Sequence, residues 1–432
     1  MLLKHSILTS LMIALMAVLS SCTQKEDNDL IYIHAGTLID VVGEQVLTNQ
    51  IITVRDERIL SVNPFDDNIA YSNLIDWSDY TVLPGLIDGH THLIGDIQSD
   101  DVLAPIKASA EEDMASGVIH AYKTIKAGFT TVIDVGTYRA FVDVKLRNDI
   151  NSGKVDGPRM YVSGAYITAP GGGGEVVGLD YDAEIPDEFR RGVSANAKQV
   201  KERVKYLIDG DVDLIKVIAT GAVLTVGTEP GEPEFSESEI KAAVDEAKKY
   251  GKYVTAHAHG AEGIKMAVRA GVRSIQHGSL MDDESIQMMA ESGTWLVADI
   301  YNGDYINEVG TAEGWPEETM RKNRETTDVQ RAGFAKAVKA GVNIAFGTDS
   351  GVYPHGTNAN QFAYMVRYGL TPMQAIKSAT IWGATSMSLE DEIGSIEVGK
   401  YADMIAVKGN PLSDITLLEN IQAVIKGGKI IR

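Results

Sequence analysis

The sequence predicts an α/β protein: a (β/α)8 TIM barrel with a small β-sandwich-like domain formed from both termini. Two observations predict this fold. Short apolar runs and helical patterns alternate eight times through the middle of the chain, which is typical of a closed parallel barrel rather than an open sheet. Both ends contain short strand-like runs, such as Gln50–Val54 and Asp403–Val407, and neither end is long enough to bury a core alone.

The strands are placed by their apolar runs. Residues 30–82 and 394–432 are expected to make the composite β-domain, and residues 83–393 the barrel. Runs without polar alternation fit parallel strands that are covered on both faces. The eight expected barrel strands are Thr81–Leu86, Thr130–Asp134, Met160–Gly164, Leu214–Ala219, Tyr253–Ala256, Ser274–His277, Trp295–Ala298 and Asn343–Gly347.

Helical patterns separate these strands. The pattern at Ser236–Tyr250 starts with Ser236 and has Glu239 three residues later, which is the arrangement of a capping box. Active sites of such barrels lie at the carboxyl ends of the strands, so the polar residues found there are the first candidates for a site. Further helices are expected at Asp113–Ala127, Ala195–Ile208, Gly263–Ala270, Asp282–Ser292, Thr326–Ala340 and Thr371–Ala384.

The composition limits the partners. The 432 residues contain 39 Lys and Arg against 60 Asp and Glu, which gives a formal charge of −21. Such a chain repels polyanions, so no nucleic-acid partner is expected and a small-molecule substrate is. Because there is one cysteine, neither a disulfide within the chain nor a cysteine-based zinc site can form. The sequence leaves open whether the chain forms a homo-oligomer.

The amino-terminal residues predict export across the inner membrane. Lys4 precedes an apolar stretch, Ile7–Leu19, that is short for a membrane span and typical of a signal peptide. The Leu-Ser-Ser-Cys sequence that ends at Cys22 resembles a bacterial lipobox. Residues 1–22 are therefore expected to be a lipoprotein signal peptide, with a lipid anchor on Cys22 and a polar tether at 23–29. This predicts a periplasmic or cell-surface lipoprotein, and a plain secretory signal with an incidental cysteine is the alternative.

Ligand-type side chains occur on or just after several of the expected strands. His90 and His92, two residues apart after the first strand, are expected to point the same way because strand side chains alternate. His257 and His277 end the fifth and sixth strands, and Asp349 follows the eighth. A lone histidine at one such position is more often a buried structural residue, but such groups on several strands indicate a metal site.

Lys216 adds an unusual group to this set. It lies among apolar neighbours in the fourth strand, where a lysine is rarely buried without a partner. One interpretation is an amine at the strand's end that reaches solvent or a carboxylate. The chemical alternative is a carbamate formed with CO2, which turns the cation into an anionic ligand able to bridge two divalent metals.

The combined pattern resembles the amidohydrolase superfamily. The resemblance rests on the run Pro84–His92, on the barrel histidines and aspartate, and on the run Gly394–Asp403, and it extends over nearly the whole mature chain. The most similar branch is related to imidazolonepropionase and contains metal-dependent Xaa-Pro and other dipeptidases and ochratoxin-type amidases. The resemblance implies two divalent metal ions, for which zinc is suited. It assigns one ion to His90, His92 and Asp349 and the other to His257 and His277, with carboxylated Lys216 as the bridge.

The resemblance also implies hydrolysis of an amide bond in a dipeptide, N-acyl amino acid or similar small molecule. The metals would activate a water, and Asp349 would take its proton and pass it to the leaving amine. An ester, lactone or phosphotriester is the alternative substrate, since activated water does not choose its electrophile. A deaminase, suggested by His259 with Glu262, is a lesser alternative because it has no need of Lys216. The non-enzymatic alternative is a lipoprotein that uses an inactive barrel for binding.

Three further residues are expected to contact the substrate. His259 lies two residues after His257 and is interpreted as a neighbour of the metal ligands rather than a ligand. His355 follows the eighth strand and either touches substrate or structures its loop. Tyr301, with Tyr305 and Trp315 in the same loop, is a candidate wall for an apolar substrate, with ordinary packing as the alternative.

Two departures from the related dipeptidases concern the same region. Those enzymes often carry Gly-Gly-His-Gly after the third strand, whereas Gly171–Gly174 here lacks the histidine, and Gly172 and Gly173 are expected to face the substrate. A tyrosine common in that branch corresponds to Phe235, which removes a hydroxyl able to bind substrate. These departures argue against a strict dipeptidase more than against hydrolysis.

Overall fold

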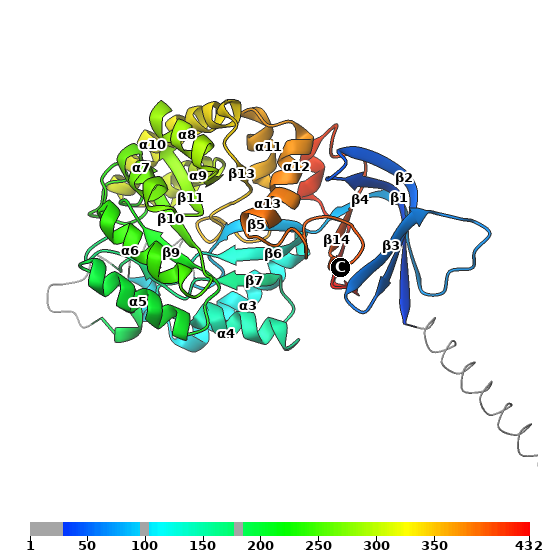
Figure 1. Ribbon diagram of the computed structural model, residues 1–432, viewed down its shortest axis with the longest axis horizontal. Helices are drawn as coiled ribbons and strands as arrows, with labels where there is room; N and C mark the ends of the chain where they lie inside the picture. The colour runs from blue at the N-terminus through cyan, green and yellow to red at the C-terminus, as the bar shows by residue number, and fades with distance from the viewer. Residues whose placement is uncertain (1–28, 96–102, 177–184) are drawn as a thin grey trace, which may run out of the picture.

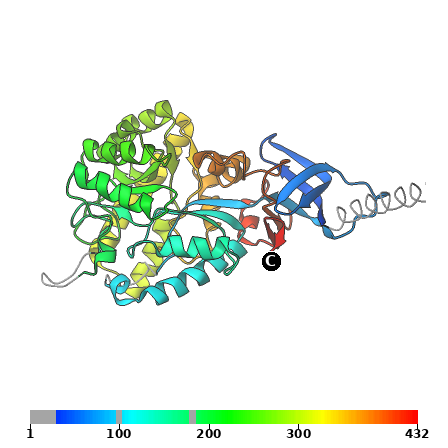
Figure 2. The same cartoon turned by 60° about the horizontal axis from the view of Figure 1, so that its bottom comes forward.

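A computed structural model describes residues 29–95, 103–176 and 185–432 of the chain. It consists of a barrel with a separate β-domain beside it (Figures 1 and 2). The predicted fold class is confirmed. The expected signal peptide with Cys22, and the tether up to residue 28, lie outside the described residues. Within the described ranges, no helix combines the length and the apolar character needed to cross a membrane.

The β-domain is built from both ends of the chain. Its sheet has the order β16-β15-β14-β4-β1-β2-β3, with β1 parallel to β4 and β4 antiparallel to β14, so strands from the two ends meet in mid-sheet. Ile33, Ile52 and Met404 belong to its own apolar core. The strands are β1 (Leu30–Asp40), β2 (Gln45–Arg55), β3 (Arg58–Pro64), β4 (Leu74–Pro84), β14 (Met404–Val407), β15 (Ala423–Lys426) and β16 (Lys429–Ile430).

The barrel wall is made of two parallel ladders, β5-β6-β7 and β8 through β13. They join on one side where Asp213 N–H donates to the Val162 carbonyl (2.8 Å), and on the other where Gly89 N–H donates to the Phe346 carbonyl (2.8 Å). The last barrel strand therefore lies beside the first. The strands are β5 (Leu86–Thr91), β6 (Phe129–Asp134), β7 (Arg159–Val162), β8 (Tyr166–Ile167), β9 (Ile215–Ile218), β10 (Val254–Gly260), β11 (Ser274–Leu280), β12 (Trp295–Val297) and β13 (Ile344–Ala345).

Helices surround the barrel wall (Figure 1). The predicted capping box at the start of α6 is confirmed: Ser236 N–H donates to Glu239 Oε2 (2.8 Å). The sequence did not predict α4, α9 or α11. The helices are α2 (Ala104–Lys107), α3 (Ala110–Lys126), α4 (Val142–Asn151), α5 (Ala197–Asp209), α6 (Glu237–Lys248), α7 (Ala261–Ala270), α8 (Asp283–Ser292), α9 (Asn302–Glu313), α10 (Glu317–Ala340), α11 (Asn360–Arg367), α12 (Pro372–Ser378) and α13 (Ile381–Ser386), with short 3-10 helices at Asp187–Phe189 and Ile415–Glu419.

The strand expected at Thr81–Leu86 is split between the two domains. Residues up to Pro84 pair with β14 in the β-domain, and Leu86 begins β5 of the barrel. Gly85 is the joint: its N–H donates to the Asp403 carbonyl (2.9 Å), and a Cβ there would lie 2.2 Å from Thr130 Oγ1. The chain can thus pass closely over β6 only with glycine at this position.

The helix expected at Thr371–Ala384 is also interrupted. Its carbonyls at Ser378 and Ala379 accept hydrogen bonds from Phe346 N–H (3.0 Å) and Ile87 N–H (2.7 Å). Carbonyls used by neighbouring barrel segments are not free to continue an α-helical ladder, so α12 ends and α13 begins after them.

An aromatic stack fastens the β-domain to the barrel. The Tyr401 ring lies between the guanidinium groups of Arg58 and Arg159, each 3.6 Å from the ring centroid. Arg159 begins barrel strand β7 and also pairs with Asp403 (3.3 Å). One arginine from the β-domain and one from the barrel therefore make cation–π contacts with the same ring, and these contacts connect the two domains.

Candidate metal centre

Two histidines of the first barrel strand face the aspartate that follows the last one. His90 lies in β5 and His92 just beyond it. His90 Nδ1–H donates to Gln276 Oε1 (2.7 Å), and His92 Nδ1–H donates to the Gly136 carbonyl (2.9 Å). Their Nε2 atoms therefore point inward and lie 3.2 Å and 3.3 Å from Asp349 Oδ1.

Asp349 is held in place by its backbone as well as by its side chain. Its N–H donates to the His90 carbonyl (2.9 Å), and its φ of 59° is in the left-handed region, as is the φ of 70° at His277. Such a conformation costs a non-glycine residue about 1 kcal/mol, and it persists where the surroundings enforce it. Burial alone would raise the pKa of the carboxyl, but the close approach of His90 and His92 to Oδ1 holds that pKa well below its usual value.

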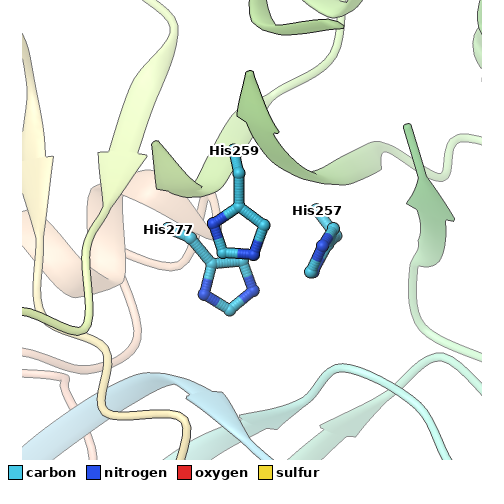
Figure 3. A group of neighbouring side chains, drawn as sticks. All are labelled: His257, His259 and His277. Atoms are coloured by element: carbon cyan, nitrogen blue, oxygen red, sulfur yellow. The ribbon is translucent and has the colours of Figure 1, made fainter. Parts of the chain in front are cut away.

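A second group of histidines lies on β10 and β11 (Figure 3). His257 and His259 are two residues apart on β10 and both face inward, and His277 lies on β11. One nitrogen from each ring lies within 4.8 Å of the others, and His90, His277 and Asp349 form a second group of the same kind. His277 therefore belongs to both groups and joins them into one centre.

The hydrogen bonds of these three histidines show which ring nitrogens are free to bind a metal. His257 Nε2–H donates to the Gly221 carbonyl (3.2 Å), which leaves Nδ1 facing the centre. His277 Nδ1 pairs with Asp299 Oδ1 (3.0 Å), and His259 Nδ1 contacts Ser279 Oγ (2.8 Å), which leaves Nε2 of each. An imidazole whose other nitrogen is held by a carbonyl or carboxylate is the usual arrangement of a metal-binding histidine.

Burial keeps three of these imidazoles neutral. It lowers the pKa of His90 to about 3 and that of His259 to about 3, and it lowers the pKa of His257 well below its usual value. A neutral imidazole has the lone pair that a metal needs, so these three rings are in the metal-binding form at neutral pH.

Lys216 brings a nearly fully buried amine to the same place. It lies in β9 and lines the cavity with the histidines. Within the described part of the chain, its Nζ makes no hydrogen bond or ion pair. Burial lowers the pKa of the amine to about 7, against the opposing charges of Asp349, Asp299 and Asp134. A sizeable fraction of the amine is therefore neutral at physiological pH.

Asp299 lies behind the histidines and was not predicted. It accepts hydrogen bonds from Gln330 Nε2 (2.9 Å) and Asn302 Nδ2 (3.1 Å) besides its contact with His277. Although burial opposes this, the charge and hydrogen bond of His277 lower the pKa of Asp299 to about 2. Asp299 thus remains ionised and orients the His277 ring.

Asp88 links the first barrel strand to the segment that follows the last barrel strand. Its carboxylate accepts hydrogen bonds from Thr348 Oγ1 (2.6 Å), Asn358 Nδ2 (2.8 Å) and the N–H of His90 (3.1 Å). Burial raises the pKa of this carboxyl to about 7. The network fixes the backbone of His90 relative to the segment that carries Asp349.

The histidines, Lys216, Asp299 and Asp349 open into one cavity of about 180 Å³. The six predicted metal-ligating residues line it: His90, His92, Lys216, His257, His277 and Asp349. They come from five strands that are far apart in sequence, and they meet because the carboxyl ends of barrel strands share one mouth. A donor set of imidazole nitrogens and a carboxylate suits a divalent transition metal such as zinc.

Of the residues expected near the substrate, His259 and Gly173 line the cavity. Gly172 does not; it packs on Glu234, where a Cβ would lie 2.4 Å from Oε2. The expectation that Phe235 faces the substrate is wrong, because its ring is buried in the main apolar core. The loop after β9 instead presents residues 222–226 to the cavity.

Tyr301 and His355 also lie away from the cavity. Tyr301 packs edge-on against Tyr353, with ring centroids 5.0 Å apart, and is a packing residue rather than a wall of the site. His355 is buried behind the centre, where its Nε2–H donates to the His92 carbonyl (3.1 Å) and its ring stacks on His120. It therefore structures the His92 loop, as its alternative interpretation held.

Several lining residues had no prediction. Tyr138, Tyr166, Asp299 and Asn302 all face the cavity. Asp299 lies two residues beyond the end of β12, so the rule that found Asp349 would have found it too. Tyr138 follows β6 in an irregular segment and Tyr166 lies in the two-residue strand β8, and neither segment is long enough for its spacing to reveal the side-chain direction.

Comparison with known proteins agrees with this geometry. The chain matches the amidohydrolase family over residues 81–431. Ochratoxinase of Aspergillus niger is 31% identical over 427 residues, covering 93% of this chain and 86% of that protein. A crystal structure of an Xaa-Pro dipeptidase with methionine bound in its active site is 42% identical, with a TM-score of 0.86, covering 93% and 99% of the two chains. Imidazolonepropionase of Micrococcus luteus is 24% identical over 403 residues, covering 85% and 89%.

Imidazoles and a carboxylate gathered at the mouth of a parallel barrel define a metal-dependent hydrolase. The chain belongs to the amidohydrolase family. It is an enzyme that hydrolyses carbon–nitrogen bonds of small substrates.

Replacing His259 by Gln should weaken the pH dependence of stability in the metal-free protein. The His259 pKa is about 3 when folded, against 6.5 for an ordinary histidine, so its stabilising effect is present above pH 6.5 and is lost as the pH falls. Between pH 7.5 and 5.5, the unfolding free energy of the parent should fall by about 1 kcal/mol more than that of the variant. Denaturant titration at the two pH values measures this. An equal fall in both proteins would contradict the assignment of His259 as a buried neutral group.

Proposed function

We propose that the protein is a binuclear metal-dependent amidohydrolase that cleaves an amide bond in a dipeptide, N-acyl amino acid or similar small molecule. One observation carries the proposal: four predicted ligand imidazoles, Asp349 and a buried lysine amine line the same cavity. Amide-hydrolysing relatives that cover most of the chain support the bond type.

The proposed ligands form two sets. His90, His92 and Asp349 hold one ion, supported by the approach of both Nε2 atoms to one carboxylate oxygen. His257 and His277 hold the other. His259 offers a nitrogen in the same group, but the other nitrogen of His257 is held by a backbone carbonyl, as is typical of metal ligands, whereas that of His259 contacts a hydroxyl. Zinc is the proposed metal, because the donors are nitrogen and oxygen.

Lys216 is the proposed bridge, as a carbamate. The reaction joins its neutral amine to CO2 and releases one proton, so it requires an unprotonated nitrogen. A pKa of about 7 supplies that form. The anionic product would lie beside the cations, which removes the cost of burying a charged ammonium next to them.

Divalent ions bound here would supply Lewis acidity and lower the pKa of a water molecule. Asp349 then has two distinguishable oxygens. Oδ1 faces the two imidazoles, and Oδ2 accepts a hydrogen bond from Asn302 Nδ2 (3.0 Å). Oδ2 is the proposed base that takes the proton of the attacking water and returns it to the leaving nitrogen.

Changing Asp349 to Asn should abolish amide hydrolysis while the histidine ligands keep much of the metal. Asparagine has nearly the same shape but cannot accept a proton, so kcat should fall at least a thousandfold. The test assays zinc-loaded parent and variant on a library of dipeptides and N-acyl amino acids, with metal content measured by elemental analysis.

Esters and phosphotriesters are assayed beside the amides. Hydrolysis of esters or phosphotriesters alone would overturn the amide assignment. Full activity in the Asp349→Asn variant would refute the proton-transfer role, and a metal-loaded parent that hydrolyses nothing would favour a binding protein.

Changing Lys216 to Ala should remove activity and lower the zinc content, because the bridging group is lost. Added acetate or propionate should restore part of the activity by placing a carboxylate where the carbamate stood. Lys216→Arg is the matched control: it keeps the positive charge, forms no carbamate, and should stay inactive without rescue. Unchanged zinc content and activity in Lys216→Ala would contradict the bridge.

We also propose that the protein is a lipoprotein exported across the inner membrane and anchored through Cys22. The support is the order of a basic start, an apolar stretch and a lipobox-like end in residues 1–22. Changing Cys22 to Ser in the full chain should move the protein from the membrane fraction to the soluble fraction and abolish labelling with a fatty acid. Equal membrane association of both forms would argue for a plain signal peptide.

A further inference from the structure

One side of the cavity is apolar and lies close to the metal centre. Leu224, Ile306, Trp315 and Val352 all line it, and we call these four residues the apolar wall. Ile306, Trp315 and Val352 belong to a buried cluster of their own, and Leu224 packs against it. The wall is therefore a continuous surface rather than scattered apolar contacts.

Two short connections link the apolar wall to the catalytic aspartate. Asn302, at the start of α9, donates to Asp349 Oδ2 (3.0 Å), and Ile306 follows one helical turn later, about 6 Å further along the axis. Val352 N–H donates to the Asp349 carbonyl (3.1 Å). When the scissile bond of a substrate lies at Asp349, a substrate side chain next to that bond can therefore reach the apolar wall.

The turn after α9 sets the position of the Trp315 ring. The helix ends at Gly314, whose φ is 75°, and Trp315 N–H donates back to the Gly310 carbonyl (2.9 Å), as in a Schellman turn. A Cβ on Gly310 would lie 3.3 Å from the indole, so glycine lets the ring lie against the helix. Trp315 Nε1–H donates to Glu313 (3.0 Å). The ring is fixed before any ligand arrives.

The surface that α10 adds beside the apolar wall is polar but uncharged. Thr319, Asn323, Thr326 and Gln330 line the cavity from one side of α10, at the spacing of a helical face. Among the described residues that line the cavity, Lys216 is the lone lysine or arginine, and it belongs to the metal centre. Outside the metal centre, Glu175 is the carboxylate among the described lining residues, and it is already paired with Arg190 (3.1 Å). A charged side chain placed against the apolar wall would therefore lose its hydration without gaining a free partner there.

We propose that the apolar wall is the specificity subsite of the enzyme and selects amides that carry an uncharged apolar side chain, of leucine to phenylalanine size, beside the scissile bond. This inference rests on the proposed function. The indole is held in place before a substrate binds, and the polar face of α10 lies next to the apolar wall.

The test compares the zinc-loaded parent and Trp315→Ala on two dipeptide series, Xaa-Ala and Ala-Xaa, with Phe, Leu, Ser, Asp or Lys as Xaa. In one series, kcat/KM of the parent should be at least about tenfold higher for Phe and Leu than for Ser, and lowest for Asp and Lys. Trp315→Ala should lose this preference, because kcat/KM should fall much further for Phe and Leu than for Ser. Leu224→Ala, on a different loop, should reduce the preference in the same direction.

Trp382→Ala is the matched control. Trp382 packs against Trp295 and Ala345 in a separate cluster that does not line the cavity, so the preference should survive its loss. An undiminished preference in both Trp315→Ala and Leu224→Ala, or a parent that prefers Ser or Asp in both series, would overturn the subsite.

Calorimetric binding of L-phenylalanine and L-serine separates this proposal from the proposed function, since neither amino acid is hydrolysed. If the parent binds phenylalanine at least about tenfold more tightly than serine, and Trp315→Ala does not, the subsite stands even where no dipeptide is cleaved. Equal binding of the two amino acids by a parent that cleaves dipeptides without side-chain preference would reject the subsite and leave the hydrolase intact.

Discussion

The contact of His90 and His92 with one oxygen of Asp349 is the interaction on which the rest of the structure depends. It joins the first barrel strand to the segment after the last one, at the seam where Gly89 also bonds to the Phe346 carbonyl. Asp88 strengthens the same seam, because its carboxylate accepts hydrogen bonds from Thr348 and Asn358. Closure of the barrel and assembly of the metal centre are therefore one event, because a barrel that failed to close would also separate the histidines from the aspartate.

Without metal, the centre makes the free energy of folding less favourable. It buries neutral imidazoles, a lysine amine and two carboxylates, and it holds His277 and Asp349 at positive φ. Cations would compensate for these costs, since metal binding uses the neutral imidazoles and the ionised Asp349 that the site already contains. The hydrogen bonds that four of the rings donate to Gln276, Gly136, Gly221 and Asp299 keep these rings turned toward the centre.

The cavity at the barrel mouth has two halves: one carries the groups suited to metal binding, and the other is proposed to select the substrate. β5, β9, β10 and β11 and the segment after β13 carry the groups suited to metals, whereas α9, the turn at Trp315 and the loop after β9 carry the apolar wall. Asn302 belongs to both halves, since it opens α9 and also binds Asp349. Changes in α9 can therefore alter which substrate fits while the strands keep the chemistry unchanged.

By itself, the sequence determined the alternation of strands and helices and the residue types at the strand ends, since both follow from local periodicity and composition. It could thus place His90, His92, Lys216, His257, His277 and Asp349 at one mouth before any coordinates. Tertiary structure decided what lies beyond the strand ends: Phe235 and Tyr301 turn into packed interiors, and His355 supports a backbone carbonyl. It also decided that Trp315, for which the sequence left both a wall and ordinary packing open, faces the cavity. The reason is that a loop side chain takes its direction from contacts with residues far away in sequence, such as Gly310 beneath the indole or Ala379 bonded to β5, and no local pattern records them.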